Sequence, residues 1–170
     1  MNRLTLTLAA LLTAGAAHAE RVALPNLPVS VDAPSLLELN AGGISKLFPG
    51  VNRPEAVLLT GDQRVVMSFE WRPTSLRTTE VGTLVQQFPA VLRKQVPNLK
   101  SLTQGALQLN GTQWAQFVIT APGKTGDVRR EMLVTSAGGR MLILTISGLA
   151  TDYTKNLGTI LAFRNSLKVN

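Results

Sequence analysis

The 170-residue sequence contains no cysteine and a single histidine, His18. Without cysteine the chain cannot form a disulfide, so its stability must come from packing. We expect His18 to be removed with an N-terminal signal, which leaves the working protein without either residue. Zinc, copper and haem sites of the usual kinds, Ser-His-Asp triads and Cys-His pairs are therefore excluded. Carboxylate chemistry, a Ser-Lys arrangement and hard-metal binding through oxygen ligands stay open, and we expect no metal and no cofactor.

Residues 1–19 have the pattern of a cleavable signal peptide. Arg3 provides a short positive start, and residues 4–16 form an uncharged apolar run that is too short to span a bilayer as a helix. An Ala-x-Ala motif ends at Ala19, so we expect cleavage after this residue. The prediction is a periplasmic or secreted protein with one domain, residues 20–170. An uncleaved membrane anchor is the alternative, whereas a lipoprotein is excluded by the lack of cysteine.

Acidic residues are fewer than basic ones. The chain has 17 Lys and Arg against 10 Asp and Glu, a formal charge of +7, which becomes +6 when Arg3 leaves with the signal. This charge would attract an anionic lipid headgroup, wall polymer, nucleic acid or acidic protein. The basic residues are scattered, with no run longer than a pair such as Arg129-Arg130, which favours the simpler interpretation that they keep the surface soluble.

In the first half of the working chain, the spacing of apolar residues is irregular up to residue 54 and becomes regular after it. Residues 20–54 are rich in proline and glycine, and within them we expect a strand at 29–31, a helical turn at 34–39 and another short element at 44–48. Apolar residues then alternate with polar ones, which predicts a β-hairpin of residues 56–60 and 64–71. Arg72-Pro73 is expected to end the second strand.

A helical stripe follows over residues 79–96. Its apolar members recur at helical spacing: Val81, Leu84, Val85, Phe88, Leu92 and Val96. Pro89 lies inside this pattern, where it removes a hydrogen bond and clashes with the preceding turn. We therefore expect either a kink at Pro89 or two short helices.

Four more strands are predicted before a closing helix. Asn110-Gly111 and Gly138-Gly139 are tight-turn sequences, and the strands on either side of them are 99–109 with 112–120 and 128–136 with 141–147. Residues 141–146 are apolar at nearly every position, which predicts a central strand covered on both faces. Thr151 is expected to cap the closing helix, whose inward stripe is Tyr153, Leu157, Ile160, Leu161, Phe163 and Leu167.

This order of elements predicts an α+β fold. Two amphipathic helices and one sheet buried on both faces form a three-layer α/β/α sandwich with a mainly antiparallel sheet.

Several segments resemble the Mog1/PsbP-like family, including bacterial envelope proteins similar to DcrB. They are the proline-containing N-terminal segment, the hairpin that ends at Trp71, the helix with Leu84 and Leu92, residues 107–114, the strand 139–145 and the closing helix with residues 163–167. The resemblance covers residues 24–170 and rests on the order of the elements rather than on a catalytic motif.

The resemblance implies a function in binding rather than catalysis. Members of this fold act mostly as binding or accessory modules, among them a Ran GTPase-binding factor, an extrinsic subunit of photosystem II, bacterial surface proteins and secretion-linked chaperones. PsbP-type metal sites use histidine in part, so a similar metal role does not fit a working chain without histidine. No set of functional residues of the family matches positions in this sequence, and a fold does not determine a function.

Catalytic motifs are absent from the sequence. Gly-Lys-Thr at 123–125 lacks the first glycine of a phosphate-binding loop, and a strand follows it instead of a helix. Ser166 and Lys168 have the wrong spacing for a Ser-Lys pair. The carboxylates Glu70, Asp127 and Glu131 are candidates for acid-base chemistry, but the sequence cannot bring them together. For Arg129 and Glu131 the simpler expectation is an exposed pair on one strand face.

Five residues are candidates for contact with an anion or a partner. They are the arginines Arg129, Arg130 and Arg140 and the tryptophans Trp71 and Trp114. Arg129 starts one strand of a predicted hairpin and Arg140 belongs to its turn, so we expect them near opposite ends. Tryptophans are more often core anchors than exposed contacts, and these two would support binding only if exposed.

The sequence leaves three functional hypotheses. The first is an exported, non-catalytic binding or accessory protein of the cell envelope that contacts an envelope protein partner. The second is a binder of an anionic ligand, such as a lipid headgroup, a wall polymer or nucleic acid. The third is a hydrolase that uses carboxylates. The identity of the partner and the oligomeric state stay open.

Overall fold

The computed structural model describes residues 21–32, 35–96 and 98–170, so the predicted signal peptide lies outside the described residues. Its main feature is a seven-stranded antiparallel sheet. In spatial order the strands are β3 (Leu37–Glu38), β4 (Ala56–Leu59), β5 (Val65–Ser75), β9 (Arg140–Leu149), β8 (Asp127–Ala137), β7 (Thr112–Pro122) and β6 (Ser101–Leu109). The hairpins β6–β7 and β8–β9 have the turns predicted at Asn110-Gly111 and Gly138-Gly139.

A second, three-stranded sheet consists of β1 (Val22–Ala23), β2 (Val29–Val31) and β10 (Lys168–Val169). The strand predicted at 29–31 is confirmed, and its pairing with β10 places the C-terminus beside the N-terminal segment. Val29 and Val31 are buried in the main core. The small sheet therefore covers part of the large one.

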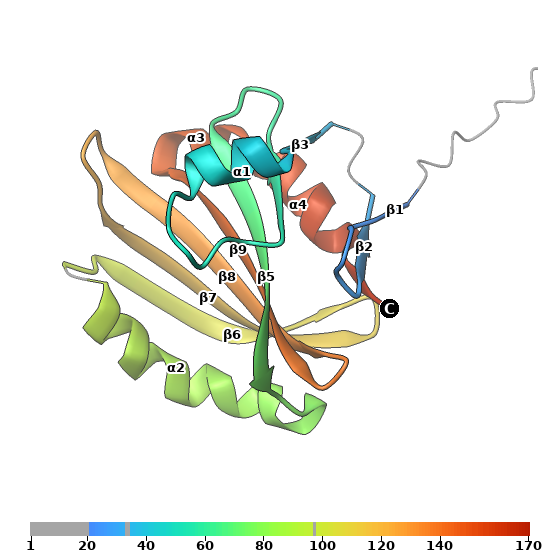
Figure 1. Cartoon of the computed structure of the whole chain (residues 1–170). Coiled ribbons are helices and arrows are strands. Elements are labelled where there is room, and N and C mark those ends of the chain that lie inside the picture. Colours follow the sequence, from blue (N-terminus) through green and yellow to red (C-terminus); the bar gives the residue numbers. More distant parts are fainter. Residues whose placement is uncertain (1–20, 33–34, 97) are drawn as a thin grey trace, which may run out of the picture.

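Helices cover both faces of the large sheet (Figure 1). One face carries α1 (Ala41–Leu47) and α2 (Val81–Gln95), which follows the short 3-10 helix η1 (Thr78–Glu80). The other face carries α3 (Ala150–Lys155), α4 (Leu157–Ser166) and the small sheet. The predicted α+β sandwich with a mainly antiparallel sheet is confirmed.

The two faces of the large sheet differ in their side chains because residues alternate along each strand. On the α4 side, β9 presents Leu142, Leu144 and Ile146, all fully buried against Phe69 and Phe163. On the opposite side β9 presents Ile143, Thr145 and Ser147, which are only partly buried. The prediction that this strand is covered on both faces is thus wrong on the α1–α2 side, because α1 and α2 cover the sheet's flanks and leave its centre open.

The N-terminal segment differs from the expectation in one place. A helical turn was predicted at 34–39, but residues 37–38 form β3, which extends the edge of the sheet by pairing with β4. The short element expected at 44–48 belongs to α1, where the Oδ1 atom of Asn40 accepts a hydrogen bond from the Gly43 N–H at 2.9 Å. Asn40 therefore provides the cap that starts this helix.

Strand β5 runs past the proline that was expected to end it. Arg72 pairs with Met141, and the next paired residue is Ser75, opposite Arg140. Pro73 and Thr74 bulge out of the ladder between them. A bulge tolerates proline because the missing N–H is not needed there, and the strand can resume afterwards.

Helix α2 is continuous through Pro89, so the alternative of two short helices is wrong. Val81 and Leu92 are buried on either side of Pro89, which is itself buried. A proline inside a helix costs about 3 kcal/mol. Burial of large apolar side chains, at about 1.5–3 kcal/mol each, offsets this cost.

The closing helix is divided into α3 and α4 at Asn156, and α3 begins one residue before Thr151. Asn156 Nδ2 donates to Asp62 Oδ2 at 3.0 Å. Asp62 also accepts from the Thr60 hydroxyl at 2.7 Å, and these bonds lower the pKa of Asp62 from 3.8 to about 2. Leu157, predicted to face inward, directly follows the break and is exposed.

Candidate functional site

The centre of the large sheet between α1 and α2 is a groove with a volume of about 630 Å³. We call it the α1–α2 groove. Its floor consists of neighbouring residues on β5, β9 and β8, and its sides are formed by the end of α1 and by the C-terminal half of α2. Figure 1 shows the two helices over different parts of the sheet, with strands between them. Its volume lies in the range of small-molecule sites.

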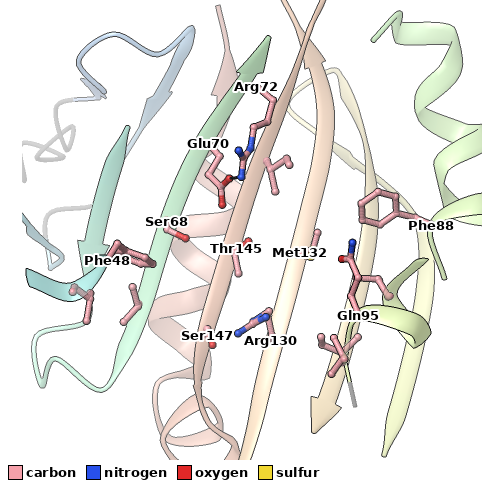
Figure 2. Close-up of a pocket in the computed structure, with 16 residues that line it drawn as sticks. Phe48, Ser68, Glu70, Arg72, Phe88, Gln95, Arg130, Met132, Thr145 and Ser147 are labelled. Carbon is pink, nitrogen blue, oxygen red and sulfur yellow. Dashed lines mark ion pairs between the residues drawn. The ribbon is translucent and has the colours of Figure 1, made fainter. Parts of the chain in front are cut away.

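Strand register determines which residues meet on the floor. Arg130 lies opposite Ser147, and Met132 lies opposite Thr145, across the β8–β9 ladder. Thr145 in turn lies opposite Ser68 on β5. Ser68 and Thr145 therefore lie at the centre of the groove, and Ser147 lies beside Arg130 toward one end (Figure 2).

These hydroxyl groups are available to a ligand. Within the described ranges, none of the Ser68, Thr145 and Ser147 hydroxyls forms a hydrogen bond to the protein in this structure. Ser68 is the most buried of them, with 7% of its surface exposed, yet it lines the groove. A buried polar group normally finds a partner. The groove is thus equipped with donors and acceptors that the fold itself does not use.

Apolar side chains form most of the α2 wall. Phe88, Leu92 and Val96 project from α2 and its C-terminal end, and Ile119 and Met132 adjoin them on β7 and β8. The opposite wall is narrower and is formed by Leu47 and Phe48 at the end of α1. The groove is consequently apolar along α2 and more polar over β5 and β9.

Charge in the groove is concentrated at its two ends. Glu70 and Arg72 form an ion pair at one end and neutralise each other. Arg130 lies at the other end, between the hydroxyl floor and α2 (Figure 2). No ion pair or hydrogen bond to Arg130 is found among the described residues. Arg130 also borders a smaller apolar hollow of about 220 Å³ next to Pro122 and Val128.

The three candidate arginines do not form one patch. Arg129 and Arg130 are adjacent on β8, and alternation places them on opposite faces of the sheet. Arg129 lies above the ring of Tyr153, with its guanidinium carbon 4.8 Å from the ring centroid. Arg140 is at the other end of the β8–β9 hairpin, opposite Ala137, as expected. Only Arg130 reaches the α1–α2 groove.

The two tryptophans have structural contacts. Trp114 is fully buried in the main core, which leaves it no surface for a partner in this fold. Trp71 is partly buried, and its Nε1 donates to the Ala137 carbonyl at 3.1 Å. The guanidinium of Arg140 stacks 3.9 Å above the Trp71 ring and donates to the Trp71 carbonyl at 2.8 Å. Arg140 and Trp71 thus hold each other in place beside the β8–β9 turn.

Glu131 is not part of an exposed pair with Arg129, contrary to the expectation. It is 3% exposed and faces the α4 side. Its carboxylate accepts hydrogen bonds from Gln116 at 2.6 Å, from the Tyr153 hydroxyl at 2.5 Å and from Arg164 at 3.0 Å. Sequence reasoning missed this network because Tyr153 on α3 and Arg164 on α4 lie 22 and 33 residues after Glu131.

Burial of Tyr153 and its bond to Glu131 raise the pKa of the phenol above its ordinary value. Removal from water is the larger cause, and the negative carboxylate adds to it. The phenol therefore stays protonated and donates to Glu131 at neutral pH. This network holds α3 and α4 to the sheet rather than forming an open site.

The other candidate carboxylates lie in separate places. Glu70 pairs with Arg72 in the groove, whereas Asp127 binds Lys100 at 2.7 Å at the start of β8.

The described residues contain no group of three or more His, Cys, Asp or Glu side chains able to hold a metal ion. They also include no helix with the length and apolarity needed to cross a membrane.

Comparison with known proteins identifies the fold. The sequence matches no protein-family model and no curated protein. Among solved structures it is similar to LpqN of Mycobacterium tuberculosis, described as involved in cell envelope biogenesis, with a TM-score of 0.55 and 12% identity over 82% of this chain and 83% of LpqN. It is also similar to cyanobacterial PsbP (CyanoP) of Synechocystis sp. PCC 6803, with a TM-score of 0.53 and 11% identity over 92% and 96% of the two chains.

The chain has the Mog1/PsbP-like fold. The predicted resemblance is confirmed at the level of the fold, which the low identities alone support. Within this Mog1/PsbP-like domain, the groove residues that the sequence did not single out are Ser68, Thr145 and Ser147. The sequence contains one indication of them: Thr145 and Ser147 occupy alternate positions on one face of β9, while Leu142, Leu144 and Ile146 occupy the other face.

Proposed function

We propose that this protein is an exported, non-catalytic binding or accessory protein of the cell envelope, and that the α1–α2 groove is the surface through which it binds. The observation that carries this proposal is the groove itself, which has a volume of about 630 Å³ and is lined by apolar walls and by hydroxyls that have no hydrogen-bond partner among the described residues. The candidate carboxylates are engaged in separate ion pairs, which does not favour a hydrolase. The similarity to LpqN supports the envelope setting.

Crosslinking from the groove tests the proposal. Leu47 at the groove edge and Leu157 on α4 are both large, apolar and exposed, at 46% and 41%. They lie on opposite faces of the sheet, so they form a matched pair. Each is replaced by a photoreactive phenylalanine analogue in the producing cells, and the envelope fraction is irradiated.

We expect adducts at position 47 and none, or far fewer, at position 157. Mass spectrometry of the adduct then shows whether a protein or a lipid was bound. Equal labelling from the two positions, or labelling from position 157 alone, would refute the groove as the binding surface. Recovery of both variants in the cytosol instead of the envelope would contradict the proposed location.

A further inference from the structure

We propose that the α1–α2 groove binds a single-chain amphiphile with an anionic head group, with the head at Arg130 and the chain along α2. This inference rests on the proposed function and names the class of ligand for the same groove. It follows from how charge, hydroxyls and apolar side chains are distributed over the lining.

The position of the anion follows from the charges. Of the two arginines in the lining, Arg72 is already neutralised by Glu70. Arg130 has no acidic partner within the described parts of the chain, and it lies opposite Ser147 in the β8–β9 register. A carboxylate or phosphate at this corner would accept hydrogen bonds from the guanidinium and from the Ser147 hydroxyl.

The oxygens of the head group also have partners further along the floor. Thr145 is two residues from Ser147 on the same face of β9, and Ser68 lies opposite Thr145. Ser68 is more than nine-tenths buried and makes no hydrogen bond within the described residues. A purely apolar occupant would leave these hydroxyls covered without a partner, which is unfavourable. An occupant with several oxygens satisfies them.

The path of the chain follows from the α2 wall. Phe88, Leu92 and Val96 face Met132 and Ile119 across this side of the groove. The stretch of β5 that lines the groove, from Val66 to Arg72, is about 20 Å long at the usual rise per residue. An alkyl chain placed here would be buried against α2 on one side, while the head remains over the hydroxyl floor.

Ligand series test the proposal directly on the purified protein. Isothermal titration calorimetry is carried out with decanoate, decyl phosphate and decanol, which share the chain and differ in the head. We expect both anions to bind at least about tenfold more tightly than decanol, corresponding to about 1.4 kcal/mol. The tighter anion identifies the head as carboxylate or phosphate. Equal affinity for decanol would refute the role of the anion.

Chain length provides a second measurement. Full burial of two methylene groups corresponds to about a fifteenfold change in Kd. The groove is not an enclosed cavity, so the added methylene groups are only partly buried and we expect about a fivefold tightening from decanoate to dodecanoate. Affinity that does not change with chain length would refute binding of the chain in the groove.

Variants locate the binding site. Arg130→Gln should weaken decanoate about tenfold and leave decanol unchanged, because only the charge is lost. Arg93→Gln is the matched control, since Arg93 is exposed on α2 and is not part of the lining. Ser147→Phe fills the floor beside Arg130 and should abolish binding of all three compounds. Unchanged far-ultraviolet circular dichroism establishes that each variant is folded.

The two proposals can fail separately. If position 47 crosslinks to an envelope protein while decanoate, decyl phosphate and decanol do not bind, the amphiphile is refuted and the proposed function stands. If decanoate binds equally well to wild type, Arg130→Gln and Ser147→Phe, its site lies elsewhere and the inference is refuted. If position 47 captures nothing and no compound binds, both proposals fail.

Discussion

Replacing Glu131 with glutamine tests whether the buried network stabilises the domain. The substitution keeps the shape of the side chain but removes its charge. Gln116 and Arg164 donate to Oε1 of Glu131 and Tyr153 donates to Oε2, so the single amide oxygen of glutamine can keep the bonds at only one of these positions, and Arg164 loses its anionic partner. The expected result is a less stable protein with an unchanged fold.

The size of the effect follows from burial. Removing one member of a buried ion pair costs about 3–5 kcal/mol. The Arg164 side chain is 18% exposed, so water compensates part of the loss. We expect Glu131→Gln to lower the free energy of unfolding by about 2–4 kcal/mol. A loss of 3 kcal/mol corresponds to a fall of roughly 6–12 °C in Tm for a domain of this size.

A double variant separates the ion pair from the rest of the network. Glu131→Leu combined with Arg164→Met removes both charges and leaves no buried charge unpaired. Tyr153 and Gln116 then lose their acceptor, which costs about 1–2 kcal/mol. The double variant should therefore be more stable than Glu131→Leu alone. Urea denaturation followed by circular dichroism provides the values. A loss below about 1 kcal/mol for Glu131→Gln, or a double variant no more stable than Glu131→Leu alone, would refute the reasoning.

Three further predictions use other parts of the structure. Tyr153 is the only tyrosine in the chain, and its pKa is raised in the folded protein. The free energy of unfolding should therefore fall above about pH 10. The absorbance of the Tyr153 phenolate should appear together with alkaline unfolding rather than before it. The pKa of Asp62 is lowered, so the stability that its carboxylate contributes is present above about pH 4 and is lost as the pH falls toward 2. In Asp62→Asn the free energy of unfolding should therefore depend less steeply on pH between about 4 and 2. An equally steep dependence in the variant would contradict this. Gly148→Ala places a Cβ atom 2.9 Å from the Arg64 carbonyl oxygen and should lower Tm, with a loss of about 1–3 kcal/mol, whereas Gly105→Ala meets nothing within 4 Å and should leave Tm unchanged or slightly higher.

Local patterns were sufficient to predict most of the individual elements. Asn110-Gly111 and Gly138-Gly139 adopt positive φ angles, as their tight turns require, and the two C-terminal hairpins form around them. Alternation at residues 65–71 and the helical stripe at 81–96 also predicted their elements. These signals depend on neighbouring residues, so the sequence contains them directly.

Contacts between distant segments could not be predicted in the same way. At the break between α3 and α4, Asn156 forms a hydrogen bond to Asp62, which lies 94 positions earlier in the chain. The burial of Glu131 depends on Arg164. Sequence periodicity contains no information about partners that are distant in the chain. Periodicity therefore predicted one continuous helix and an exposed charge pair.

The groove was missed for a related reason. Predicting it requires knowledge of which part of the sheet the helices leave uncovered, and that depends on how α1 and α2 are placed. Alternation along β8 places Arg129 and Arg130 on opposite faces, but the sequence does not show which of the two faces carries the groove.

The position of β9 beside β5 has a consequence for how the chain folds. Val65 pairs with Gly148, 83 residues later, whereas each hairpin of the C-terminal half joins strands that are close in sequence. Local hairpins form quickly, and pairing between distant strands is slow because a long loop must close first. The large sheet is therefore complete only after β5, which pairs with β4, has also paired with β9. Until β9 pairs with β5, the edge of β5 that faces β9 has no partner, and unpaired strand edges of this kind favour aggregation during folding.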